Sequence, residues 1–80
     1  MKNKKNYQKI FLDSLDLDEK QFNEDIKYND VPEWDSIGHM TLISGLEEGF
    51  DIAMDTDDII DFSSYKKGME ILEKYKIVFN

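Results

Sequence analysis

The chain has 80 residues, enough for one small domain but too few for an ordinary substrate pocket with a supporting shell. Eighteen acidic residues against ten lysines give a formal charge of -8, and such a field repels nucleic acid and anionic lipid. The absence of cysteine excludes disulfides, thiolate catalysis and cysteine-bound zinc.

No targeting segment is expected. The lysine-rich start resembles the charged end of a signal peptide, but the apolar run Ile10-Phe11-Leu12 is interrupted at once by Asp13. No stretch approaches the length needed to span a membrane. We therefore expect a cytoplasmic protein that binds neither nucleic acid nor membranes.

The first predicted helix runs from about Lys4 to Leu15, where apolar residues recur at helical spacing: Tyr7, Ile10, Phe11 and Leu15. Residues 1–5 should fray, because lysines near a helix start oppose its macrodipole. Residues 16–34 keep no single period, so they predict a long loop with one short helical turn at Glu19–Asn23. A loop of this length must be pinned by apolar anchors, for which the candidates are Phe22, Ile26, Tyr28, Val31 and Trp34.

The second predicted helix starts after Pro32, which biases the preceding residue away from the helical conformation. Asp35 is a good N-cap, so we expect the helix to run from Ser36 to about Gly49. Each interior glycine costs a helix roughly 1 kcal/mol relative to alanine, so this helix must depend on tertiary packing. Gly45 is expected to allow the close approach of a neighbouring helix.

Two shorter helices complete an all-α prediction. Asp55 or Thr56 caps a short acidic helix that ends near Asp61, with its acidic residues in the favourable first turn. Ser63 or Ser64 caps the last helix, whose apolar stripe consists of Tyr65, Met69, Ile71, Leu72 and Tyr75 or Lys76. The final Ile77-Val78-Phe79 either extends this helix or packs as a tail.

Charge is distributed unevenly along the chain. Between Lys27 and Lys66 there are ten acidic residues and no basic one. A block of one sign around a candidate site favours docking on a basic protein surface. The acidic residues of this block should also repel one another, so salt or divalent cations are expected to stabilise the protein.

Ser36 is the candidate site, interpreted as a hydroxyl at a helix start that another enzyme modifies. Asp35, Ser36 and His39 are the residue types of a hydrolytic triad, but residues on one helical turn cannot form its geometry. No Gly-x-Ser-x-Gly elbow is present either. His39 is the only histidine, and it either contacts a partner beside the serine or has no special role.

The aspartates invite a calcium interpretation, which fails on spacing. An EF-hand loop starting at Asp16 would place Lys20, Gln21 and Lys27 at positions that need ligands, a glycine and a glutamate. A loop starting at Asp55 would place Ile59 and Ile60 at its fifth and sixth positions, which need a ligand and a glycine. No metal site is predicted, although loose binding of divalent ions to the acidic block remains open.

A family resemblance is carried by Asp35-Ser36-Ile37, which resembles the Asp-Ser-Leu or Asp-Ser-Ile signature of acyl carrier proteins. Further matching residues follow in the same order and spacing: Leu42, Leu46-Glu47-Glu48, Phe50-Asp51 and Thr56-Asp57-Asp58-Ile59-Ile60. The resemblance extends from the first helix to about Tyr75. It implies that residues 1–80 form a single acyl-carrier-type domain, an all-α four-helix bundle with a long first loop and a short third helix.

The resemblance also implies the chemistry. A magnesium-dependent phosphopantetheinyl transferase would attach phosphopantetheine from coenzyme A to Ser36, and the thiol of this arm would carry acyl or aminoacyl groups as thioesters. The chain itself would supply no catalytic group and would not be an enzyme. Its partners would be the enzymes that load and accept the cargo, and we expect the carrier to be a monomer. Basic surfaces of these enzymes would dock on residues drawn from the two central helices: Asp35, Ile37, His39, Met40, Glu47, Glu48, Asp57 and Asp58.

The chain departs from the pattern of carriers in fatty acid biosynthesis, which usually have acidic residues two and five positions after the serine. Gly38 and Thr41 stand there instead. Together with Trp34 and His39, they are more typical of carriers in specialised biosynthetic pathways. Two alternatives stay open: an unmodified acidic protein-interaction module, and the housekeeping carrier of fatty acid biosynthesis in lipid metabolism.

Overall fold

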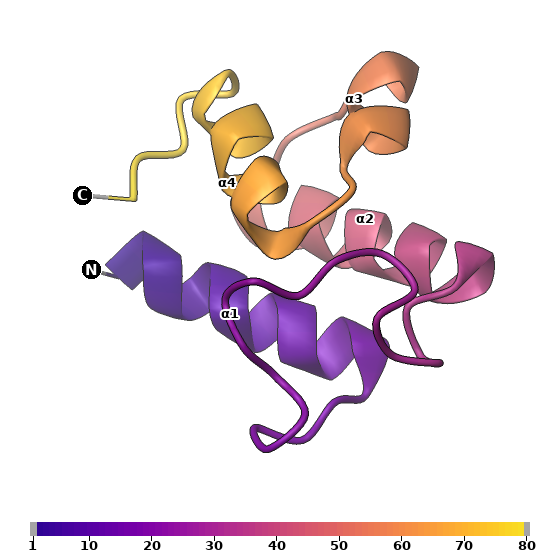
Figure 1. The fold of residues 1–80 in the computed structure, drawn as a ribbon. Helices are drawn as coiled ribbons and strands as arrows, with labels where there is room; N and C mark the ends of the chain where they lie inside the picture. The colour runs from indigo at the N-terminus through magenta and orange to yellow at the C-terminus, as the bar shows by residue number, and fades with distance from the viewer. Residues whose placement is uncertain (1, 80) are drawn as a thin grey trace.

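The computed structural model describes residues 2–79 of the chain, and the regular secondary structure of this part is helical. The helices are α1 (Lys2–Leu15), α2 (Ser36–Phe50), α3 (Thr56–Asp61) and α4 (Tyr65–Glu73). They are arranged around one interior (Figure 1). Extended pairing in residues 2–79 is limited to one isolated antiparallel bridge. The prediction of an all-α fold is confirmed.

The two ends of the chain meet. Helix α1 begins at Lys2, earlier than the predicted Lys4, so it includes most of the residues for which fraying was predicted. Met1 lies outside the described residues. The side-chain amide of Asn3 donates to the carbonyl of Val78 at 2.8 Å, which ties the start of α1 to the C-terminal tail. The start of α1 and the C-terminal tail accordingly lie near each other in Figure 1.

Helices α1 and α2 form the closest helix pair, and a small residue allows it. A Cβ atom at Gly45 would lie 2.5 Å from Ser14 Oγ and 3.2 Å from Ile10 Cγ2. A side chain there would therefore push α1 away from α2. The prediction that Gly45 permits a close helix–helix approach is confirmed.

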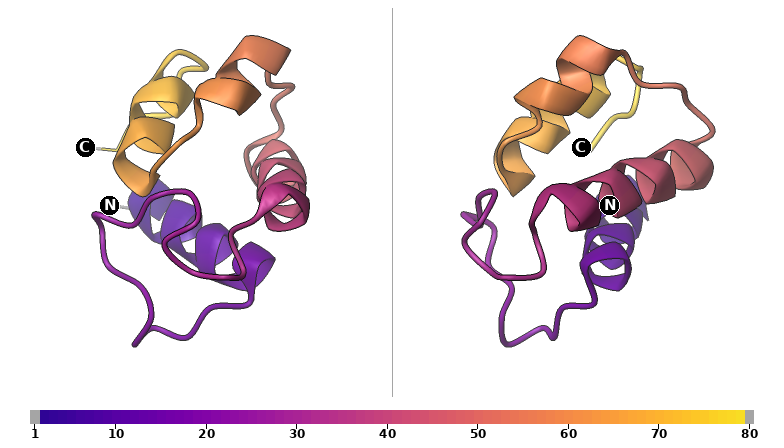
Figure 2. Two further views of the ribbon diagram at one scale, coloured as in Figure 1. Left: turned by 45° about the vertical axis from the view of Figure 1, so that its right-hand side comes forward. Right: turned by 90° about the vertical axis from the view of Figure 1, so that its right-hand side faces the viewer.

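The loop between α1 and α2 passes along α1 and reaches the start of α4 (Figure 2). The short helical turn predicted at Glu19–Asn23 is present in part, as two overlapping turns in which Gln21 N donates to Asp18 O at 2.9 Å and Phe22 N donates to Glu19 O at 3.3 Å. The loop is held to α4 by its backbone. Tyr65 N donates to Ile26 O at 3.0 Å, and Tyr28 N donates to Ser63 O at 2.9 Å.

Aromatic rings fill the core. Phe11 lies edge-on to Tyr65 and Trp34, with centroid distances of 5.2 and 5.0 Å, a favourable arrangement for aromatic pairs. The Phe79 ring lies 5.4 Å from Tyr7, so the last residues pack as a tail and do not extend α4. Trp34 has no exposed surface, and the chain just before α2 is therefore anchored in the core.

Three helical segments end without glycine. Asp16, Asp51 and Lys76 adopt left-handed φ angles of 53°, 54° and 68°. In each case the following amide closes a loop back to the helix, as Ile77 N does to Leu72 O at 3.2 Å. This is the Schellman arrangement, in which glycine is the usual left-handed residue.

The N-caps resolve the alternatives that the sequence leaves open. Asp55 occupies the N-cap of α3 but makes no side-chain capping bond. Ser64 caps α4, where its hydroxyl accepts a hydrogen bond from Lys67 N at 2.9 Å. Among α2, α3 and α4, only α3 therefore starts without a side-chain cap.

Candidate functional site

Ser36 is the first residue of α2 and is exposed. The preceding Asp35 has an extended backbone (φ -105°), and its Oδ1 accepts a hydrogen bond from Gly38 N at 2.8 Å. The predicted N-cap is thus confirmed. It orders the first turn of the helix and leaves the Ser36 hydroxyl facing solvent. Free amides at a helix start favour a bound anion, so this position suits a serine that carries a phosphate group.

His39 does not activate this serine, because both of its ring nitrogens are occupied inside the fold. The indole N–H of Trp34 donates to His39 Nδ1 at 3.0 Å, and His39 Nε2 lies 2.8 Å from the carbonyl oxygen of Ile59. Since an indole can only donate, Nδ1 accepts and Nε2 carries the proton given to Ile59. This leaves neither nitrogen for Ser36 or for the predicted contact with a partner.

An apolar groove of about 360 Å³ opens beside Ser36. Its walls come from α2, α3 and the segments before and after them, and the lining residues are Tyr28, Ser36, His39, Met40, Ile59, Ile60, Phe62 and Ser63. Three large apolar side chains that line the groove are exposed: Ile60 at 73%, Met40 at 54% and Tyr28 at 38%. Ile37, the residue after Ser36 on α2, is 77% exposed. A group attached to Ser36 therefore has an apolar surface within reach.

Helix α3, one wall of the groove, is tied to the end of α4 by a buried carboxylate. Asp58 is only 5% exposed. Its Oδ1 pairs with Lys74 Nζ and its Oδ2 accepts from the Tyr75 hydroxyl, both at 2.5 Å, while that hydroxyl accepts from Asp55 N at 2.9 Å. The hydrogen bonds from Lys74 and then Tyr75 lower the pKa of Asp58. Asp58 was predicted to contact a partner, but the structure uses its carboxylate internally.

The other predicted docking residues divide into two groups. Asp35, Glu48 and Asp57 are exposed. Glu47 is half-buried, and its carboxylate accepts a hydrogen bond from Met54 N at 2.8 Å, which orders the connection after α2. The exposed carboxylates therefore lie at three places: Asp35 before α2, Glu48 near the end of α2, and Asp57 in α3. The carboxylate of Glu47, in contrast, supports the fold.

Part of the groove was missed by sequence reasoning. Tyr28, Ile60, Phe62 and Ser63 line it but were not singled out as site residues. They come from two segments that are distant in sequence, the loop before α2 and the stretch from α3 to the start of α4, which the Lys27–Ser64 bridge joins. The only available signal was Tyr28, an aromatic residue in a polar loop.

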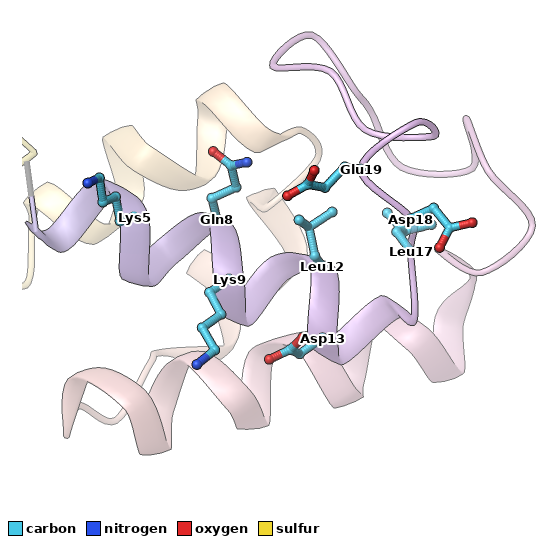
Figure 3. A pocket seen from close by; sticks show the side chains of 8 residues that line it. All are labelled: Lys5, Gln8, Lys9, Leu12, Asp13, Leu17, Asp18 and Glu19. Carbon is cyan, nitrogen blue, oxygen red and sulfur yellow. The ribbon is translucent and has the colours of Figure 1, made fainter.

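A second hollow, of about 640 Å³, lies between α1 and the loop that follows it (Figure 3). Its lining carries charges of both signs. In Figure 3 the Lys5 and Lys9 side chains point to opposite sides of α1, and the Asp18 carboxylate points away from the helix. Because its polar groups do not converge, this hollow is a surface depression and we do not consider it a site.

Comparisons of the chain with protein-family models, with curated proteins and with solved structures gave no match. Within residues 2–79, no helix combines the length and apolar character needed to cross a membrane. Side chains of the same residues form no cluster of three or more metal-ligating groups. The site is therefore interpreted from its own geometry.

Proposed function

We propose that this protein is a cytoplasmic carrier of the acyl-carrier type that serves a specialised biosynthetic pathway. The Ser36 hydroxyl loses its proton and attacks the phosphorus that carries the pantetheine of coenzyme A, the pyrophosphate bond breaks, and adenosine 3′,5′-bisphosphate leaves. The attached phosphopantetheine then supplies a thiol that holds acyl or aminoacyl cargo as a thioester. The observation that carries the proposal is an exposed serine at the capped start of α2 that opens onto an apolar groove. The four-helix arrangement with a long first loop and a short α3 suits a carrier bundle.

The residues around Ser36 fit such a group. The first turn of α2 is held by Asp35, so the serine hydroxyl is presented at a fixed position while the helix start favours a phosphodiester. The groove offers its apolar lining to cargo at the end of the arm. No side chain is needed as a base, since a phosphopantetheinyl transferase would supply the groups that activate the hydroxyl.

Partners are expected to be the transferase and the enzymes that load and accept the cargo. The exposed carboxylates of Asp35, Glu48 and Asp57 suit a basic surface, and the exposed Ile37 and Met40 suit an apolar patch within it. Gly38 and Thr41 leave the first turns of α2 uncharged. This favours a dedicated set of partner enzymes over the housekeeping fatty-acid machinery.

The test is an intact-mass measurement after incubation with coenzyme A, magnesium and a phosphopantetheinyl transferase of broad specificity. Ser44 lies exposed on the same helix and provides a matched control. We expect one phosphopantetheine on the parent and on Ser44→Ala, and none on Ser36→Ala. A folded parent that stays unmodified would overturn the proposal and favour an acidic interaction module.

A further inference from the structure

Helix α3 is a short helix that forms one wall of the groove. It has six residues, and its N-cap makes no side-chain bond. A helix of this length is not stable by itself, so its position depends on ties to its neighbours. One tie is the Asp58 cluster at the end of α4, on the side of the helix away from the groove lining. The other is the hydrogen bond between His39 of α2 and the Ile59 carbonyl.

The imidazole of His39 is itself held from several sides. Its plane lies within 17° of the Trp34 plane at a centroid distance of 6.2 Å, so the two rings lie side by side, joined by the hydrogen bond from the indole N–H to Nδ1. Tyr28 and Phe62 approach it edge-on at 5.7 and 5.9 Å. Because Trp34 is anchored in the core and also donates to Nδ1, the ring has one fixed orientation. His39 thus connects a rigid part of the core to the backbone of α3.

We infer that His39 is a positioning residue that holds α3 against α2 and so sets the width of the groove beside Ser36. The ring lines the groove and spans from one wall to the other. Without the hydrogen bond from His39, α3 is free to move away from α2. The Asp58 cluster still holds α3 to the end of α4. The role as a specificity element for cargo rests on the proposed function, whereas the mechanical role does not.

Three variants distinguish the loss of the His39 hydrogen bonds from a general loss of stability. His39→Phe keeps an aromatic ring but removes both hydrogen bonds. His39→Gln keeps one acceptor and one donor, so it can still join Trp34 to Ile59. Ser64→Ala removes the hydroxyl that caps α4 and lowers global stability, but it leaves both hydrogen bonds of His39 in place.

Amide hydrogen exchange of the unmodified protein gives the first readout. In His39→Phe we expect the amides of α3 to exchange about tenfold faster or more than those of α1, relative to the parent, because a local tie is lost. His39→Gln should restore most of the protection. Ser64→Ala should leave the ratio of α3 to α1 exchange unchanged. Unchanged α3 protection in a folded His39→Phe protein would overturn the inference.

The second readout is the nuclear Overhauser effect between methyl groups of Met40 and Ile60, which line the groove from α2 and α3. We expect weaker cross-peaks in His39→Phe and retained ones in His39→Gln. Equal intensities in all variants would show that His39 does not set the groove. Both readouts use unmodified protein, so a failed phosphopantetheine transfer would reject the carrier proposal and leave this inference to its own test.

Discussion

Tyr7 and Tyr65 stack in the core with their ring centroids 4.6 Å apart, yet their hydroxyl groups are treated differently. The Tyr7 hydroxyl donates to the backbone carbonyl of Tyr65 at 2.7 Å. The Tyr65 hydroxyl is buried without a hydrogen-bond partner among the described residues. Burial raises the pKa of Tyr65 to about 12 and that of Tyr7 well above its usual value. Both hydroxyls are therefore neutral at physiological pH, and only one of them is hydrogen-bonded.

The same one-atom deletion should consequently have opposite effects at these two positions. Tyr7→Phe removes a made hydrogen bond and should lower the free energy of unfolding by about 1 kcal/mol. Tyr65→Phe removes an unpaired buried hydroxyl and should raise it by about 1 kcal/mol. Urea unfolding of both variants beside the parent measures the two values. Shifts of equal sign would contradict this view of the core.

Asp35 has a structural role besides its place next to Ser36. Its carboxylate caps the first turn of α2 through Gly38 N. Asp35→Ala should lower the free energy of unfolding by about 1 kcal/mol, whereas Asp35→Asn keeps the acceptor and should lose far less. Chemical denaturation followed by circular dichroism compares them. If asparagine were as damaging as alanine, the charge and not the cap would be the stabilising feature.

At the scale of helices, the residues with a left-handed φ at the helix ends are positions where a substitution by glycine should raise stability. Lys76 holds φ at 68°, a conformation that disfavours a residue with a Cβ atom. Lys76→Gly should therefore raise the free energy of unfolding by about 1 kcal/mol. Asp51→Gly should gain less, because aspartate tolerates this region better than lysine. Thermal and urea unfolding test both, and a loss of stability in Lys76→Gly would argue that the lysine side chain stabilises this end.

The tie between α3 and α4 predicts a pH dependence. Hydrogen bonds from Lys74 and Tyr75 lower the pKa of Asp58 in the folded state, so the unfolded chain takes up the proton first as the solution is acidified. The contribution of Asp58 to stability is present above about pH 4 and is lost as the pH falls through the lowered pKa.

Melting temperatures of the parent and of Asp58→Asn across this pH range test the dependence. At neutral pH the parent should melt at a higher temperature than Asp58→Asn. The difference between the two melting temperatures should narrow in acid. The exposed neighbour Asp57 is the control, and Asp57→Asn should keep the acid response of the parent. A gap that does not change with pH would mean that Asp58 acts through packing alone.

At the scale of the whole molecule, the acidic block between Lys27 and Lys66 covers both α2 and α3. Like charges in this region repel one another, and salt screens them. The melting temperature should rise with sodium chloride and rise further with millimolar magnesium at equal ionic strength. Melting that responds to neither would show that the block does not strain the fold.

Much of the framework could be predicted because it depends on local chemistry. Asp35 after Pro32 marked the start of α2, and Gly45 marked the contact with α1. Helix ends were harder to predict, since Asp51 and Lys76 take the left-handed position without the glycine that usually signals it. The path of the loop after Asn23 could not be predicted, because the backbone bonds of Ile26 and Tyr28 at the start of α4 join segments that are distant in sequence.

Of the candidate site, the sequence indicated the central serine but not the groove beside it. Ser36 followed from its neighbours in sequence, but the groove depends on segments that meet only in the fold. Asp58 belongs to an acidic run that looks uniformly exposed, and its burial depends on Lys74 and Tyr75 from the end of α4. His39 could be placed beside the serine, yet its two partners lie on a loop and on another helix.

The buried position of Trp34 also gives this domain a built-in optical signal. It is the only tryptophan of the chain, it has no exposed surface, and it lies directly before Asp35 and Ser36. Its emission comes from one environment, in contact with the imidazole that reaches α3. The proposed modification of Ser36, the proposed docking of an enzyme and the inferred release of α3 can therefore each be tested by intrinsic fluorescence, without attaching a dye.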